Sequence, residues 1–181
     1  MNYTVRILMT QLVTHDVRRY IVERPEGFEF RPGQAVMLAL NQEGWEKERR
    51  SFTPTSLPED RVLEFTIKTY PEHAGVTDRM RHLGPGDELL MSRPFGTLTY
   101  KGPGTFIAGG AGFTPFMAML RGLARDGELG GHRLILSNKT PADIICPQEF
   151  RHYLGERCHF LCTREAGSGC AEGRITRDYL E

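Results

Sequence analysis

The chain has 181 residues, and its 23 lysines and arginines balance its 23 aspartates and glutamates, so the formal net charge at pH 7 is zero. This balance argues against a nucleic-acid-binding or anionic-membrane protein, because both need an excess of positive charge. No stretch approaches the roughly 18 apolar residues of a membrane span, and the N-terminus lacks a signal-peptide pattern, so we expect a cytoplasmic protein without a membrane partner.

The first hundred residues have the pattern of short strands. Apolar residues alternate or cluster over residues 3–9, 17–23, 35–40, 50–56, 62–69 and 88–92, with Gly, Pro and Asp between them. Such spacing predicts a six-stranded antiparallel barrel, because a closed sheet has no exposed edges. One helix is expected among the strands, with Thr77 as its N-cap and the Gly84-Pro85-Gly86 turn as its end.

From about residue 104 the pattern changes. Apolar strands are expected over residues 105–108, 133–136 and around Phe160-Leu161, and they alternate with helices over 114–124 and 147–154. This alternation predicts βαβ units on a parallel sheet. The fold class is therefore β + α/β, with one domain over residues 1–101 and a second over 102–181.

The cysteines do not suggest a metal site. They form no Cys-x-x-Cys pair and lack the spacing of a plant-type iron–sulfur cluster. We expect reduced thiols, as in cytosolic proteins, and no bound metal. The four are Cys146, Cys158, Cys162 and Cys170.

Residues 109–115 (GGAGFTP) follow a predicted strand and open a predicted helix. Glycines let the backbone approach a pyrophosphate, and a helix N-terminus attracts anions. Pro115 stands where a Gly-x-Gly-x-x-Gly fingerprint has its third glycine, and no P-loop lysine follows. By itself the segment is either a nucleotide site or a tight strand-to-helix turn.

Residues 49–53 (RRSFT) begin a predicted strand, which places Arg50 and Phe52 on one face and Ser51 and Thr53 on the other. Arg50 could bind a phosphate, Phe52 could pack on a planar ring, and Thr53 could donate to a ring nitrogen. The alternative is a barrel strand with a core Phe and a solvent-facing Arg. Residues 75–77 (GVT) are a second anion site or an ordinary helix cap.

Four motifs in chain order resemble the ferredoxin–NADP reductase superfamily, which joins a flavin-binding barrel to a pyridine-nucleotide-binding α/β domain. The motifs are Arg50-x-Phe52-Thr53, Gly75-x-Thr77, Pro94-Phe95-Gly96 and Gly110-x-Gly112-x-Thr114-Pro115. The resemblance implies an FAD-binding domain over residues 1–101 and an NAD(P)-binding domain over 102–181. It favours FAD over FMN, because the helix after residue 75 would contact the pyrophosphate.

The resemblance also implies roles for flavin-site residues. Arg50 would pair with the flavin pyrophosphate, Phe52 would pack against the isoalloxazine, and Thr53 would hydrogen-bond near the flavin N5 and act at the reacting atoms. Phe52 replaces the family's usual Tyr and so lacks one hydroxyl. Further flavin contacts are implied for Ser51, Ile67, Lys68, Thr69, Gly75, Val76 and Thr77.

For the nicotinamide nucleotide, the resemblance implies contacts from Gly110, Gly112, Thr114 and Pro115, with Thr114 at the hydride-transferring carbon. Cations at three positions match those that bind the 2′-phosphate in NADP-dependent relatives, which favours NADPH over NADH. The alternative is that these cations are solvated surface charges. They are Lys139, Arg164 and Arg174.

The function implied is a flavin-dependent NAD(P)H oxidoreductase that passes electrons to a separate carrier such as ferredoxin or flavodoxin. The alternatives are the reductase component of an oxygenase, a free-flavin reductase, or a non-catalytic flavin- or nucleotide-binding module. Family members continue with a further strand beside the first strand of the parallel sheet. We therefore expect the second domain to be incomplete and its uncovered edge, at residues 105–109, to favour self-association.

Overall fold

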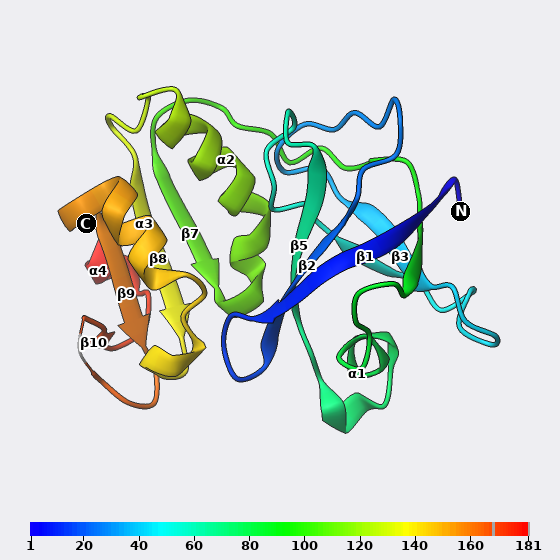
Figure 1. The fold of residues 1–181 in the computed structure, drawn as a ribbon. Coiled ribbons are helices and arrows are strands. Elements are labelled where there is room, and N and C mark those ends of the chain that lie inside the picture. The colour runs from blue at the N-terminus through cyan, green and yellow to red at the C-terminus, as the bar shows by residue number, and fades with distance from the viewer. Residues whose placement is uncertain (168, 181) are drawn as a thin grey trace. The chain divides into compact units, whose positions relative to one another are not determined.

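The computed structural model describes residues 1–167 and 169–180. Packing divides the chain into two units, which are best considered separately in Figure 1. The first unit contains Met1–Tyr100 and Thr114–Gly122, and the second contains Lys101–Phe113 and Leu123–Glu181. Among the described residues, no helix has both the length and the apolar character needed to cross a membrane.

The first unit is built on a six-stranded antiparallel sheet with the strand order β4-β3-β6-β1-β2-β5. An isolated bridge between Pro54 and Phe65 connects the segment after β4 to β5, so the two ends of the sheet meet and the barrel nearly closes. The predicted barrel is thus confirmed. Its strands are β1 (Tyr3–Leu12), β2 (Val17–Glu23), β3 (Val36–Leu40), β4 (Arg50–Phe52), β5 (Val62–Lys68) and β6 (Glu88–Met91).

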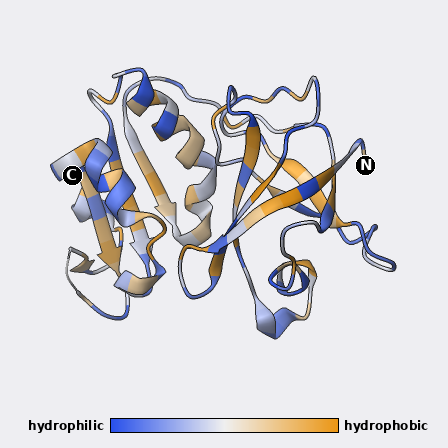
Figure 2. Cartoon of the chain, in the orientation of Figure 1, coloured by the Kyte–Doolittle hydropathy of each residue, from blue (hydrophilic) through white to orange (hydrophobic). Residues whose placement is uncertain are grey.

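Alternating side chains form the barrel core. In β1, Val5 and Ile7 are buried while Thr4 and Arg6 are exposed, as the period of two requires. A register shift between Ile7 and Met9 interrupts this alternation. Figure 2 shows the resulting hydrophobic stretches along the strands and hydrophilic residues in many of the turns.

Helix α1 (Val76–Met80) follows a short 3-10 helix, η1 (Pro71–His73). Val76 and Met80 are both buried in the barrel core, and the Tyr20 hydroxyl donates a 2.9 Å hydrogen bond to the Met80 carbonyl. These contacts set the start of the helix at Val76, with Gly75 as the N-cap. The expectation that Thr77 caps the helix was wrong, because Thr77 lies within the first turn.

The second unit contains a parallel sheet with the order β10-β9-β8-β7, which confirms the α/β class. The short strand β10 was not expected from the sequence. In the described part of the chain β7 pairs only with β8, and self-association through that edge stays a prediction. The strands are β7 (Thr105–Gly109), β8 (Arg133–Asn138), β9 (Cys158–Cys162) and β10 (Ala171–Glu172).

Helices connect these strands near the predicted positions. The longest, α2 (Thr114–Arg125), follows β7 and places its first nine residues in the first unit. Helix α3 (Pro147–Leu154) matches the predicted range and buries Phe150 and Leu154. The remaining helices are η2 (Gly110–Phe113), η3 (Pro141–Asp143), η4 (Gly155–Arg157) and α4 (Arg177–Leu180).

Candidate functional site

Arg50 begins β4 and has an exposed side chain. Its Nη1 donates a 2.8 Å hydrogen bond to the Arg49 carbonyl and lies 3.9 Å from a carboxylate oxygen of Glu48. Both contacts use the same nitrogen, so the guanidinium can present its Nη2 and Nε donors to an anion. The position suits binding of a phosphate.

The residues that follow Arg50 do not alternate as expected. Phe52 is partly buried and packs against the barrel core, as the structural alternative supposed, and Thr53 is buried whereas Ser51 is exposed. The alternation fails because β4 ends at Phe52, before the chain reaches Thr53. Phe52 and Thr53 follow Arg50 in the sequence by two and three positions.

The end of β5 carries three more predicted flavin contacts. Ile67 is buried in the barrel core, and the Lys68 ammonium lies 2.6 Å from a carboxylate oxygen of Asp16. The backbone N–H and the hydroxyl of Thr69 both donate to the Asp16 carbonyl, at 2.8 and 3.0 Å. The side chains of Lys68 and Thr69 and the Thr69 backbone N–H thus have structural partners, and the contacts of residues 67–69 to a flavin stay a prediction.

The first unit offers groups suited to an anionic ligand with a planar ring. The Pro54–Phe65 bridge brings the segment after β4 next to β5, so the predicted contacts at residues 50–53 and 67–69 belong to one end of the barrel wall. At α1, Gly75 is the extended N-cap residue, Val76 is in the core and Thr77 is partly exposed. A guanidinium, an aromatic ring and a threonine hydroxyl match the chemistry of FAD.

In the second unit, the glycine-rich segment forms the 3-10 turn η2 after β7. Gly110 has a φ of +48°, a conformation that L-residues rarely adopt. A Cβ added at Gly110 or Gly112 would meet no described atom within 4 Å. The backbone is therefore open to close approach by a ligand, and α2 begins directly afterwards with a half-buried Thr114 and with Pro115 in its first turn.

The three predicted cations lie at the carboxyl ends of neighbouring parallel strands. The Arg164 N–H donates to the Lys139 carbonyl at 2.9 Å, and the Gly173 N–H donates to the Cys162 carbonyl at 3.0 Å, directly before Arg174. All three cationic side chains are exposed. Ligands of open α/β sheets bind at this end of the strands, so the arrangement fits an anionic ligand.

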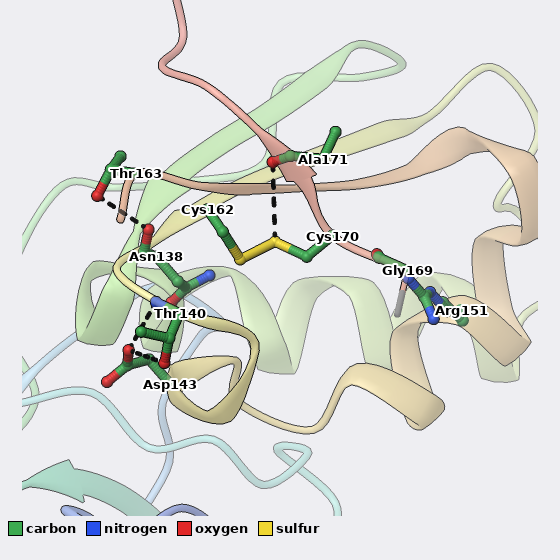
Figure 3. The surroundings of a disulfide bond; sticks show 9 residues. All are labelled: Asn138, Thr140, Asp143, Arg151, Cys162, Thr163, Gly169, Cys170 and Ala171. Carbon is green, nitrogen blue, oxygen red and sulfur yellow. Dashed lines mark hydrogen bonds between the residues drawn. A yellow bond between two sulfur atoms is a disulfide. The ribbon is translucent and has the colours of Figure 1, made fainter. Parts of the chain in front are cut away.

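Asn138 ends β8 beside these cations and is 7% exposed. Its carbonyl accepts hydrogen bonds from the N–H and hydroxyl of Thr163, at 2.9 and 3.3 Å, whereas its side-chain Nδ2 has no hydrogen-bond partner among the described residues (Figure 3). An unsatisfied buried donor costs about 1–3 kcal/mol, so this amide suits a ligand oxygen. No sequence motif singled out Asn138 as a ligand contact, although its place after a predicted parallel strand was a usable signal.

A disulfide joins Cys162 at the end of β9 to Cys170 just before β10, with a Cα–Cα distance of 5.9 Å (Figure 3). The expectation of four reduced thiols was wrong for this pair, because β10 lies beside β9 in the sheet and this brings together two cysteines that are eight positions apart in the sequence. Cys146 and Cys158 are not part of this disulfide, and burial raises the pKa of Cys158 to about 11 despite the nearby Arg151 guanidinium. The cytoplasmic location, which rested partly on reduced thiols, stays a prediction.

The comparisons with known proteins agree with this arrangement. Residues 4–100 match the family model described as the oxidoreductase FAD-binding domain, and residues 106–181 match the oxidoreductase NAD-binding domain. The chain is 28% identical over 159 residues to the ferredoxin--NAD(P)(+) reductase component of the naphthalene 1,2-dioxygenase system of Pseudomonas putida, covering 86% of this chain and 45% of that protein. It is 35% identical over 162 residues to the reductase component of propane 2-monooxygenase from Mycolicibacterium goodii, and the match covers 83% of this chain and 45% of that protein.

A solved ferredoxin NADP+ reductase from Neisseria gonorrhoeae has the same fold, with a TM-score of 0.80, 20% identity, and coverage of 98% of this chain and 75% of that one. The chain spans about half the length of the curated relatives it matches. With an FAD-binding barrel followed by an NAD-binding α/β unit, the chain belongs to the ferredoxin–NADP reductase superfamily.

Proposed function

We propose that this chain forms the flavin- and nicotinamide-binding part of an NAD(P)H oxidoreductase. The observation that carries the proposal is the unbroken match to an FAD-binding and then an NAD-binding family model within one chain. The anion-binding groups at the end of the barrel wall and at the carboxyl ends of β7, β8 and β9 support it.

In the flavin site, Arg50 binds the pyrophosphate, Phe52 contacts the isoalloxazine edge, and Thr53 donates to the ring near N5. Ser51, the backbone at residues 67–69 and the segment at residues 75–77 complete the contacts. When bound, FAD supplies the redox chemistry, because it takes up a hydride from the nicotinamide and releases two electrons to an acceptor. The protein binds and orients both rings and excludes water.

In the nucleotide site, Gly110 and Gly112 allow the backbone to approach the pyrophosphate, while Thr114 and Pro115 open the helix next to the nicotinamide. The exposed cations Lys139, Arg164 and Arg174 bind a 2′-phosphate, and the Asn138 amide donates to a ligand oxygen. The strand end lacks the carboxylate that holds an unphosphorylated ribose, since Asn138 and Lys139 stand there. These groups favour NADPH over NADH.

The electron acceptor is a separate carrier protein, such as ferredoxin or flavodoxin, or an oxygenase. Support comes from the relatives, several of which are named as reductase components of dioxygenase or monooxygenase systems. The four cysteines cannot supply a plant-type iron–sulfur cluster, so such a cluster would have to lie outside these residues.

The test is anaerobic reduction of the FAD-loaded protein by NADPH and by NADH separately. We expect a yellow protein whose flavin absorbance bleaches, faster at low concentrations of NADPH than of NADH. A protein that cannot take up FAD would overturn the flavin assignment. A protein that retains FAD but is bleached by neither nucleotide would instead be a binding module without hydride transfer.

A further inference from the structure

A partly buried ionic cluster in the first unit has no role in the ligand contacts proposed above. At its centre is Glu64 in β5, whose side chain is 13% exposed. Arg121 Nη1 lies 2.6 Å from Glu64 Oε1, Arg19 Nε lies 3.2 Å from Oε2, and the Thr55 hydroxyl donates to Oε1 at 2.6 Å. The cluster therefore joins β2, β5, the segment after β4 and helix α2.

Arg121 contacts the segment after β4 as well as the carboxylate. The same Nη1 donates a 2.6 Å hydrogen bond to the Thr55 carbonyl, and the Thr55 N–H donates to the Glu64 carbonyl at 2.7 Å. Thr55 lies two residues after Thr53. A single guanidinium thus holds the backbone segment that carries the proposed N5 contact.

The opposite end of the same helix carries the other proposed residue at the reacting atoms. Thr114 opens α2 and Arg121 follows it by seven residues, which is two helical turns, or about 10 Å along the axis. Residues seven apart lie on the same face of a helix. Both belong to the part of α2 that packs in the first unit.

A second contact supports a fixed position for this part of α2. Gly33 has a φ of +93°, and a Cβ added there would clash with the end of the Met119 side chain and with the Leu98 carbonyl. Met119 is 4% exposed, so it packs closely over the Gly33 turn. Helix α2 therefore contacts the barrel both through an apolar side chain and through the ionic cluster.

We propose that Arg121 is a positioning residue for hydride transfer. By binding Glu64 and the Thr55 carbonyl, Arg121 fixes helix α2 and so keeps Thr114 in the correct position relative to Thr53. The inference rests on the proposed function. A hydride moves over a short, well-aligned distance, and a displacement of about 1 Å can slow such a step on the order of a hundredfold. Arg121 is not among the residues proposed to contact FAD or the nicotinamide nucleotide.

The test compares Arg121→Gln and Glu64→Gln with Arg125→Gln. Arg125 lies on the same helix but forms an exposed pair with Asp126, at 2.7 Å, so its variant removes the same charge at a residue that is not among the Glu64 partners named above. We expect the rate constant for flavin reduction at saturating nucleotide to fall about ten- to a hundredfold in the first two variants, with unchanged dissociation constants for FAD and nucleotide. Arg125→Gln should match the wild type.

A second readout needs no cofactor. Hydrogen–deuterium exchange of the amides at residues 114–122 in FAD-free protein should be faster in Arg121→Gln and Glu64→Gln than in the wild type or Arg125→Gln. The double variant Arg121→Gln/Glu64→Gln should be less impaired than the sum of the two single variants, because both single variants remove the same Arg121–Glu64 ion pair. Should Arg121→Gln fail to fold, the isosteric Glu64→Gln provides the same comparison.

The outcomes separate the two proposals. Unchanged reduction rates in folded variants of an active wild type would overturn the positioning role and leave the proposed function intact. A wild type that neither nucleotide reduces would overturn the proposed function. Unchanged amide exchange over residues 114–122 would overturn the positioning role whichever result the activity assay gives.

Discussion

Arg121 on α2 and Glu64 on β5 form an ion pair with an N–O distance of 2.6 Å across 57 residues of sequence. Burial raises the pKa of the Glu64 carboxyl, but the Arg121 and Arg19 guanidiniums and hydrogen bonds from Arg121 and Thr55 outweigh it, so the pKa lies below the ordinary 4.5. Because the folded-state pKa is lowered, the ionised carboxylate stabilises the fold above pH 4.5. That contribution is lost as the pH falls through the folded-state pKa.

Glu64→Gln should therefore destabilise the protein at pH 7 by about 3 kcal/mol, since it leaves the partly buried guanidinium charge of Arg121 and Arg19 without its carboxylate. The difference from the wild type should shrink as the pH falls below 4.5. Urea unfolding at several pH values measures it, with Glu72→Gln, an exposed glutamate, as control. If the difference in the free energy of unfolding stayed constant with pH, it would contradict the lowered pKa of Glu64.

Arg50→Ala should lose FAD, because the pyrophosphate charge would lose its guanidinium partner. Removal of a charge-assisted hydrogen bond costs roughly 1.5–3 kcal/mol, so affinity should fall about ten- to a hundredfold. The flavin-to-protein absorbance ratio after desalting measures retention. The matched control is Arg49→Ala, which removes the neighbouring exposed arginine, and wild-type occupancy in Arg50→Ala would refute the motif assignment.

Thr114→Ala should slow hydride transfer more than it weakens flavin binding, since Thr114 is proposed to lie at the nicotinamide and not at the flavin phosphates. We expect about a tenfold slower flavin reduction in anaerobic stopped-flow experiments. The FAD dissociation constant should hardly change. The control is Thr4→Ala, which changes an exposed threonine on β1. If Thr114→Ala changed the reduction rate and the FAD dissociation constant by equal factors, Thr114 would not have this role.

Lys139→Ala and Arg164→Ala should weaken NADPH binding and leave NADH binding almost unchanged, because only NADPH carries the 2′-phosphate. A loss of about tenfold for each variant corresponds to one charge-assisted contact. Arg133→Ala tests specificity, since Arg133 is exposed at the amino end of the same strand as Asn138. Equal losses for both nucleotides would show that these cations do not recognise the 2′-phosphate.

Reduction of the Cys162–Cys170 disulfide, or the variant Cys170→Ser, should lower the stability of the second unit. A bond that closes a loop of 8-residue separation contributes roughly 2–3 kcal/mol by restricting the unfolded chain. Urea unfolding with and without a reductant measures the change, and Cys146→Ser, which removes a cysteine outside the disulfide, should respond like the wild type. A transition insensitive to reductant would mean that the bond does not form in solution.

Local signals predicted most elements but misplaced some of their ends. Alternation and turn residues located the barrel strands, and helical spacing located α2 and α3. The cap of α1 was misplaced because the burial of Val76 and Met80, and not the hydroxyl of Thr77, decides where that helix begins. The burial of residues 50–53 does not follow the expected alternation, because β4 is only three residues long and ends before Thr53.

The sequence by itself determined the fold class, the order of the motifs and the family, because periodicity, turn residues and short motifs are local properties of a chain. Tertiary structure decided the ion pair of Arg121 with Glu64, the disulfide of Cys162 with Cys170, and the buried amide of Asn138. Each depends on which distant segments become neighbours and in what register. That information resides in the packing of the barrel and the parallel sheet, where the free energy of burial selects one arrangement among many that the local pattern allows.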